Sequence, residues 1–383
     1  MASVEKDVSR AKTPWVVRWR DEAGKQRKRG FARKVDADRF RAEVEHSLNA
    51  GTYRDPAAGR VAFEPYAEQW RRAQPHRPNT ASRTESGLRK HAYPAFGTRP
   101  ISSIRESQLQ AWVTGLPLAP SSVRTQWSSV RAVFAAAKRD RIITIDPTEG
   151  VKLPELDIVE IVPLLVEQVD ALAEAVPGRY RALVEADAGS GLRQGEAFGL
   201  EVPHVDFLRG TIKVQQQIQP ATGHRVEICK PKNRHSVRTV PVGRVVTDAL
   251  ARHLAAYPAR DLQVVDTTGR HPVTRPARLI FTTERGLPLH RGEFNERIWG
   301  PARESAGLPG AGMHDLRHFF ASLLIRAGLS PKVVAKLLGH ANAAMTLNVY
   351  SHLWPDDEDR SREAVDAVLL RSDVPILRPK REA

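Results

Sequence analysis

The hydrophobic positions near the start of the chain follow two successive periods. Residues 14–31 alternate between apolar and polar side chains, which is the two-residue period of a strand, and a turn at 21–24 divides the stretch in two. In the first strand Trp15, Val17 and Trp19 share one face, and Val16, Arg18 and Arg20 share the other. Apolar residues then recur at helical spacing until Gly51. We therefore predict a small β-sheet backed by one helix over residues 1–51.

In the next part of the chain, up to residue 150, apolar residues recur mainly at helical spacing. Residues 52–60 contain Gly, Pro and Ala without a period, which indicates a linker. Four helices are predicted next, at about 63–73, 80–93, 105–114 and 121–138. The last of them has an apolar face, and its other face carries Arg124 and Arg131. Residues 61–150 are thus predicted to form an all-helical bundle.

The remaining pattern mixes strands and helices. Residues 151–163 contain two prolines and few helix signals, so we interpret them as a tether. Residues 160–355 are predicted to form a mixed domain that is mostly helical, and 361–370 to form a further helix with an apolar stripe. That stripe needs a partner surface, either on its own domain or on a neighbouring protomer. Both interpretations remain open for the segment 356–383.

Composition narrows the class of partner. The chain has 383 residues, which favours two or three domains, and a formal net charge of +15. Ten Lys or Arg lie between Arg10 and Lys34 against Asp21 and Glu22, a local charge of +8. Such a cluster favours nucleic acid, because Lys and Arg displace counterions from phosphates. The alternative is a protein that is basic only for solubility.

Two further features bear on location. The one cysteine, Cys229, rules out an intramolecular disulfide and fits a reducing compartment. The start of the chain lacks an apolar signal core, and no run approaches the ~18 apolar residues that span a bilayer. We expect a soluble, intracellular protein that makes no use of membranes.

Five local motifs carry the candidate chemistry. In chain order they are Ser190-Gly-Leu-Arg-Gln-Gly-Glu196, Pro231-Lys-Asn-Arg-His-Ser-Val-Arg-Thr-Val-Pro241, His314-Asp-Leu-Arg-His318, Leu338-Gly-His340 and Tyr350. One short motif has a real false-positive risk, but five in this order are hard to obtain by chance. With these residues the chain resembles the tyrosine recombinase family, the integrases of phages and integrative elements, over about 160–355.

The resemblance implies a role for each domain. Residues 1–51 would be an arm-type DNA-binding domain, 61–150 a core-binding domain, 160–355 the catalytic domain and 356–383 a C-terminal helix and tail. A basic strand pair fits the major groove of DNA as well as a helix does. The candidate DNA contacts are Arg18, Arg20, Lys25, Arg27 and Arg29 in the first domain, and Arg124 and Arg131 in the second. A solvated basic hairpin and a plain helical bundle are the alternatives.

The chemistry explains why these residue types are needed. A phenol has a pKa near 10, so tyrosine is a poor nucleophile unless it is assisted. Attack on a phosphodiester places additional negative charge on the non-bridging oxygens, and guanidinium groups match those oxygens in charge and shape. Arg193 and Arg317 are the candidates for this role. Glu196 is assigned a supporting role.

The other roles follow from the resemblance. Tyr350 would attack phosphorus to form a 3′-phosphotyrosyl link and release a 5′-hydroxyl. His314 and His340 would give hydrogen-bond or acid–base help at the phosphate, and which of them takes the tyrosine proton stays open. Lys232, with Lys230 in reserve, would protonate the leaving oxygen from a β-hairpin with strands 226–229 and 237–242. The covalent ester conserves the bond energy, so we expect no ATP, no metal and no other cofactor.

The expected partners are double-stranded DNA, through core and arm attachment sites, and further copies of the chain in a tetramer on DNA. A DNA-bending accessory protein is another expected partner. Two rival functions stay open: relaxation of DNA by a type IB topoisomerase, and DNA binding by a regulator without catalysis. The complete set of reactive residues argues against the regulator.

Overall fold

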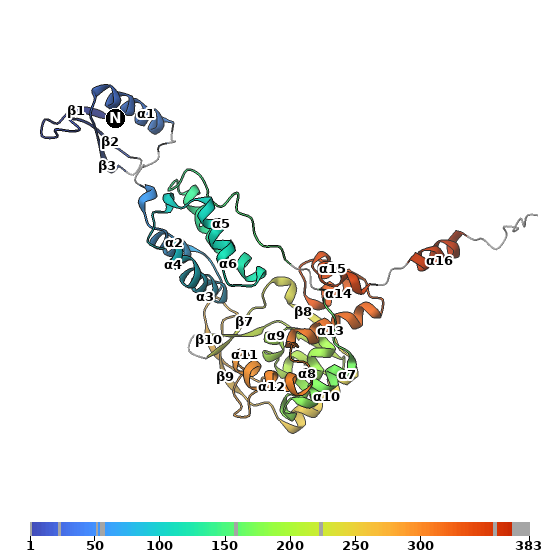
Figure 1. The fold of residues 1–383 in the computed structure, drawn as a ribbon. Helices are drawn as coiled ribbons and strands as arrows, with labels where there is room; N and C mark the ends of the chain where they lie inside the picture. Colours follow the sequence, from blue (N-terminus) through green and yellow to red (C-terminus); the bar gives the residue numbers. More distant parts are fainter. Residues whose placement is uncertain are drawn as a thin grey trace, which may run out of the picture. The chain divides into compact units, whose positions relative to one another are not determined.

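The computed structural model of the chain describes residues 2–21, 24–50, 53, 58–156, 160–221, 225–354 and 358–369. The chain divides into two compact units, residues 1–158 and 159–383 (Figure 1). Each unit has its own hydrophobic cores. No helix among the described residues is long and apolar enough to cross a membrane.

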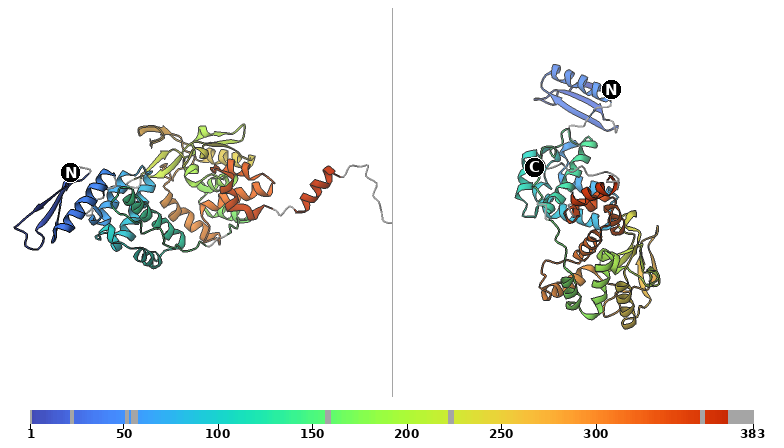
Figure 2. Two further views of the ribbon diagram at one scale, coloured as in Figure 1. Left: turned by 90° about the horizontal axis from the view of Figure 1, so that it is seen from above. Right: turned by 90° about the vertical axis from the view of Figure 1, so that its right-hand side faces the viewer.

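The first unit begins with a three-stranded antiparallel sheet. Its strands are β1 (Ser3–Lys6), β2 (Trp15–Arg20) and β3 (Gln26–Phe31), with β2 in the centre. Helix α1 (Lys34–Asn49) lies across one face of the sheet (Figure 2). The predicted sheet and helix are present, and β1 is an additional strand that the sequence analysis did not find.

The two faces of this sheet have different chemistry. Val17 and Trp19 are buried against α1, and the indole of Trp19 donates a hydrogen bond to the hydroxyl of Tyr53. Directly opposite residues of neighbouring strands share a face, and Arg18 is opposite Lys28. Arg18, Arg20 and Lys28 therefore belong to the face turned away from α1.

A helical bundle completes the first unit. Its elements are η1 (Ala58–Arg60), α2 (Phe63–Ala73), α3 (Pro78–Gly87), η2 (Leu88–Ala92), α4 (Tyr93–Phe96), η3 (Ile101–Ser103), α5 (Glu106–Gly115) and α6 (Pro120–Arg139). The four predicted helices match α2, the α3–η2–α4 run, α5 and α6. Phe63, Leu109 and Phe134 lie fully inside its core. In α6 the apolar face is buried as predicted, and Arg131 lies on the exposed side.

The second unit contains the remaining elements. The helices are α7 (Val166–Ala175), α8 (Gly178–Ser190), α9 (Gln194–Phe198), η4 (Val202–His204), η5 (Arg234–Ser236), α10 (Arg244–Ala256), α11 (Arg291–Phe294), η6 (Asn295–Trp299), α12 (Gly300–Ser305), α13 (Met313–Arg326), α14 (Pro331–Leu338), α15 (Ala343–Tyr350), η7 (Ser351–Leu353) and α16 (Glu358–Leu369). The strands are β4 (Val205–Asp206), β5 (Thr211–Val214), β6 (Gln217–Pro220), β7 (Val226–Cys229), β8 (Arg238–Pro241), β9 (Leu262–Asp266) and β10 (Val273–Ala277).

The strands form two separate sheets, which corrects one prediction. The orders are β10-β9-β7-β6 and β4-β5-β8. The predicted hairpin between β7 and β8 is therefore wrong. The hydrogen-bonding edges of β7 are occupied by β6 and β9, so β8 pairs with β5 instead. The segment 230–237 joins one sheet to the other.

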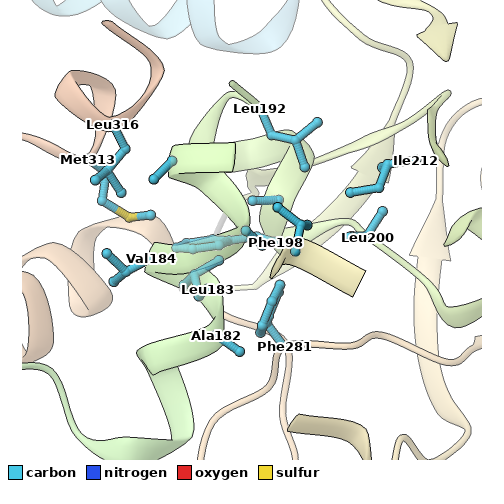
Figure 3. Close-up of a cluster of buried hydrophobic side chains, with 14 of the residues drawn as sticks. Ala182, Leu183, Val184, Leu192, Phe198, Leu200, Ile212, Phe281, Met313 and Leu316 are labelled. Carbon is cyan, nitrogen blue, oxygen red and sulfur yellow. The ribbon is translucent and has the colours of Figure 1, made fainter. Parts of the chain in front are cut away.

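Helix α8 lies at the centre of the second core. It packs against α7, α10 and α13. Leu183 and Val184 of α8 lie beside Phe198, Met313 and Leu316 in this core (Figure 3). The Arg-bearing turn after α8 and the helix α13 are therefore held by one apolar cluster.

Glycine ends two helices that matter for the site. Gly191 after α8 and Gly339 after α14 have left-handed backbones, with φ values of 61° and 69°. A Cβ atom on Gly191 would lie 2.3 Å from the ring of Phe320, so this position has room only for glycine. Ser330 and Pro331 begin α14 as predicted. In the predicted C-terminal helix, now α16, Val365 and Leu369 are exposed.

Candidate functional site

Arg193 lies at the turn between α8 and α9. Gly191 ends α8, and Arg193 is the N-cap residue of α9. Its guanidinium donates to Glu196 Oε1 at 2.7 Å, to the hydroxyl of Ser236 at 3.2 Å and to the carbonyl of Gly339 at 3.2 Å. About a quarter of the side chain remains exposed, at 25%. The guanidinium is thus fixed in direction and still accessible to an anion.

Arg317 is buried at the base of the same cluster. It is 2% exposed, and it donates to the carbonyls of Gly191 at 2.7 Å and Leu338 at 2.5 Å. Burial, with the neighbouring charges of Arg193 and Arg238, lowers the pKa of its guanidinium to about 9. The two predicted arginines therefore lie together, linked through the ends of α8 and α14.

Arg238 is a third arginine of the cluster, and the sequence analysis did not identify it. It is buried in β8 and donates to Glu196 Oε2 at 3.0 Å, to the Leu337 carbonyl at 2.6 Å and to the Ser236 carbonyl at 2.9 Å. Burial alone would raise the pKa of Glu196, but Arg238 and Arg193 outweigh it and hold that pKa below its usual value. Glu196 therefore stays ionised and supports two guanidiniums.

The two predicted histidines lie on different elements near the arginines. His314 is at the start of α13 and keeps exposed surface, whereas His340 is half-buried beside the end of α14. Desolvation is the main cause that lowers the pKa of each to about 4. Coulombic interactions add to it, with His318 and Arg317 for His314, and with Arg317 and Arg193 for His340. His340 Nδ1 is 2.8 Å from the hydroxyl of Thr346. Both imidazoles are neutral at pH 7.

Tyr350 ends α15 and is buried, at 1% exposure. Its hydroxyl lies 2.7 Å from Nδ1 of His318, a residue of α13 that the sequence analysis left without a role. Burial raises the pKa of the Tyr350 phenol to about 12. The nucleophile predicted from sequence is therefore protonated and held in place.

The two candidate lysines lie on the segment that joins the sheets. Lys230 and Lys232 are both exposed. The far end of this segment is fixed, because the side chain of Asn233 accepts from the backbone N–H of Ser236 at 2.9 Å and caps η5. Ser236 in turn contacts Arg193. The lysines are thus on the solvent side of a segment anchored to the arginine cluster.

One buried carboxyl lies close to this cluster without a hydrogen bond. Asp187 of α8 is 1% exposed, and neither of its carboxyl oxygens has a partner among the described residues. Desolvation and the charge of Glu196 raise its pKa well above the ordinary value, and Arg317 opposes this only in part. Asp187 therefore takes up a proton far more readily than an exposed aspartate does.

The candidate DNA contacts outside the second unit occupy different surroundings. Arg20, Lys25 and Arg131 are exposed, and Arg18 lies beside Glu5 at 3.1 Å. Arg27 pairs with Asp21 at 2.9 Å, and Arg29 lies over the ring of Phe40 at 4.8 Å, on the side of α1. Arg124 donates to the carbonyl of Pro154 at 2.9 Å.

The second unit thus holds an accessible guanidinium on Arg193, a buried one on Arg317, two neutral imidazoles and the buried phenol of Tyr350. These are the groups that the resemblance to the tyrosine recombinases implies. The chain belongs to the phage integrase family, whose model matches residues 163–356. A second family model, the phage integrase N-terminal SAM-like domain, matches residues 62–116, within the helical bundle.

Relatives come from phages, bacteria and transposons. The integrase of Mycobacterium phage FRAT1 is 27% identical over 341 residues, covering 86% of this chain and 97% of that protein. A XerC-like tyrosine recombinase of Caldanaerobacter subterraneus subsp. tengcongensis is 27% identical over 289 residues, covering 70% and 73%. The transposase of transposon Tn916 from Enterococcus faecalis is 26% identical over 302 residues, covering 72% and 71%.

Solved structures share the fold. The Tn1549 transposon integrase, in complex with a circular intermediate DNA, has a TM-score of 0.67 at 22% identity, covering 80% of this chain and 99% of that one. A lambda integrase dimer bound to a core site has a TM-score of 0.58 at 17% identity, covering 93% and 95%. The architecture of small sheet, helical bundle and mixed, mostly helical domain is thus that of the integrases.

The raised pKa of Asp187 gives a prediction on stability. Below pH 3.8, the ordinary pKa of an aspartate, Asp187 is protonated in both the folded and the unfolded chain. As the pH rises above that value the unfolded chain loses the proton first, so the folded state becomes less stable until the pH passes the raised pKa of the folded state. We expect Asp187→Asn to gain stability relative to the wild type as pH rises from about 4. Urea unfolding at several pH values measures this, with the exposed Asp248→Asn as control. A difference between variant and wild type that does not change with pH contradicts the prediction.

Proposed function

We propose that this chain is a site-specific recombinase that cleaves and rejoins DNA strands to integrate or excise a phage or mobile element. The observation that carries the proposal is the convergence of Arg193 and Arg317 on the segment Leu338–Gly339, on the same unit as the buried Tyr350. The guanidinium of Arg193 is held in this way and keeps a quarter of its surface exposed, so it can meet a phosphodiester oxygen, while Arg317 adds positive charge behind it. Membership of the phage integrase family supports the same conclusion.

The reaction follows from the groups at the site. The Tyr350 oxygen attacks phosphorus, the bond to the 5′-oxygen breaks, and a 3′-phosphotyrosyl ester forms. Arg193 and Arg317 neutralise the non-bridging oxygens. His340, whose Nδ1 faces Thr346, has Nε2 available for a phosphate oxygen, and His314 is placed to give the same help from α13. The ester retains the bond energy, so the reverse attack by a 5′-hydroxyl reseals the strand without ATP or a metal.

The leaving 5′-oxygen takes its proton from Lys232. The exposed position of this residue, on a segment anchored through Ser236, allows its ammonium group to approach a bound strand. Lys230 is the second candidate, since it lies on the same exposed segment.

The other domains position the DNA. The N-terminal domain, residues 1–51, would bind arm sites, and the helical bundle, residues 61–150, would bind one side of the core site. Catalysis belongs to residues 160–355, and the last helix, within 356–383, contributes to assembly. One lambda integrase structure is a tetramer bound to a Holliday junction, and two paired strand exchanges require four protomers here too. We propose a tetramer on DNA in the bacterial cytoplasm, assisted by a DNA-bending protein.

The nucleophile can be tested directly. We expect the wild type to form a covalent adduct with labelled DNA from the flanks of its own gene, nicked near the crossover point. Tyr350→Phe removes the attacking oxygen, so the adduct should be lost while DNA binding remains. A denaturing gel separates the two outcomes, and Tyr257→Phe is the matched control. An adduct that persists in Tyr350→Phe excludes this nucleophile, and relaxation of DNA without sequence preference favours a topoisomerase.

The general acid has its own test. Lys232→Ala should slow cleavage of ordinary DNA by about 10²–10⁴-fold, the usual range for loss of a general acid. A bridging 5′-phosphorothiolate leaves without a proton, so the same variant should cleave that substrate at nearly the wild-type rate. Lys230→Ala is the matched variant. The general acid is the lysine whose alanine variant regains its cleavage rate on the phosphorothiolate substrate. If neither variant is rescued, neither lysine has this role.

The arm domain yields a prediction about faces of its sheet. Arg18 and Arg20 lie on the face turned away from α1, whereas Arg27 lies opposite Trp19 on the face toward α1 and is paired with Asp21. We expect Arg18→Ala and Arg20→Ala each to weaken binding to arm DNA and to reduce the slope of log K against log salt by about one. Arg27→Ala should leave that slope unchanged. Titrations at several salt concentrations measure both, and an equal loss for all three variants contradicts a one-faced contact.

A further inference from the structure

His318 contacts the nucleophile directly. Its Nδ1 lies 2.7 Å from the hydroxyl of Tyr350, and the two ring centroids are 5.6 Å apart. Neither of the other two site histidines is engaged in this way, because His340 faces Thr346 and His314 packs edge-on against His318 at 4.8 Å. Three rings thus run in series from the buried Tyr350, through His318, to the exposed His314.

Helix α13 explains how adjacent residues serve different groups. Successive residues of an α-helix point about 100° apart. Arg317 therefore reaches the carbonyls of Gly191 and Leu338, while His318 is directed toward the end of α15. One helix fixes both the phosphate-binding guanidinium and the partner of the nucleophile.

We propose that His318 is the catalytic base that accepts the phenol proton as Tyr350 attacks phosphorus. This inference rests on the proposed function. As the bond from the phenol oxygen to phosphorus forms, the O–H bond breaks and its proton moves to Nδ1. The bond to the 5′-oxygen breaks at the same time, and that oxygen takes a proton from Lys232. In the resealing step His318 returns its proton to the phenol oxygen.

The charges around His318 suit an acceptor. Burial and the neighbouring Arg317 lower its pKa, and Asp315 opposes them only in part, so the ring is neutral at pH 7. The Tyr350 phenol, with a pKa of about 12, does not ionise without help at that pH. His314 is also neutral and lies at the surface, where it can pass a proton to solvent. His352, beyond Tyr350 in η7, is turned to the carbonyl of Ile161.

The same hydrogen bond has a rival interpretation, in which it only holds the unreactive tyrosine in place. The two interpretations predict opposite effects of His318→Asn. The asparagine amide oxygen reproduces the hydrogen-bond acceptor at Nδ1 but does not take up a proton near neutral pH. A base would therefore be lost in this variant, whereas a purely positional contact would be retained.

The experiment uses the full chain and the nicked flanking DNA with a bridging 5′-phosphorothiolate, which removes the general acid from the measured rate. Single-turnover adduct formation is followed from pH 5 to pH 10. We expect the wild-type rate to rise as His318 loses its proton and then level off. The rate of His318→Asn should be about 10²–10³-fold lower at pH 7 and should rise about tenfold per pH unit, as expected when hydroxide replaces the base.

The controls separate this role from folding and from the parent proposal. His271→Asn, at an exposed position in the second unit, should behave as the wild type. Thermal unfolding and DNA binding of each variant are measured in parallel. Should His318→Asn not fold, a wild-type rate that keeps rising tenfold per pH unit to pH 10 overturns the base role by itself.

Two other results would also overturn it: a wild-type rate and profile in His318→Asn, or faster cleavage by that variant, which would mark the contact as a restraint. A wild type that forms no adduct removes the proposed function and this role together. Adduct formation by the wild type with unchanged His318→Asn removes this role alone.

Discussion

The site depends on the hydrogen bonds that hold three buried or half-buried guanidiniums in place. Arg193 and Arg238 share the carboxylate of Glu196, and each of the three arginines also binds a carbonyl at the end of α8 or α14. Ser236 accepts two further hydrogen bonds, one from Arg193 and one from Arg238. Carbonyls at a helix C-terminus are unpaired and carry partial negative charge, so they suit cations. Both helices end in left-handed glycines, which turn the chain immediately after these carbonyls. The same contacts hold α8, α9, β8, α13 and α14 together.

This arrangement leaves a surplus of positive charge for a ligand. One ionised carboxylate does not balance three guanidiniums, and the second nearby carboxyl, Asp187, has a raised pKa. Burial lowers the pKa of His318 and His340, and the surplus lowers it further because another positive charge there is unfavourable. The cluster proposed to bind a phosphodiester thus also favours the neutral form of the imidazoles proposed to assist the reaction.

Sequence patterns identified the helices and strands whose formation depends on neighbouring residues. The strands β2 and β3, the helices of the bundle and the Ser330–Gly339 helix follow from periodicity, caps and glycine positions. Strand β1 was missed because it has only four residues and little apolar content, so it shows almost no alternation of apolar and polar positions. The pairing of β7 with β9 was missed because it depends on chain segments far apart. Arg238 and His318 escaped notice for the same reason, since their partners lie 42 and 32 residues away.

The way the segment between β7 and β8 is anchored bears on when Lys232 could reach a bound DNA strand. It is not the tip of a free hairpin, because its two ends belong to different sheets. One end is bonded through Ser236 to Arg193, the residue proposed to bind the phosphate. Under the proposed roles, a DNA strand that moves Arg193 as it binds would also move Ser236 and the segment that carries Lys232. Proton delivery by Lys232 would then depend on capture of the phosphate by Arg193, so DNA that is not fully seated would not be cut.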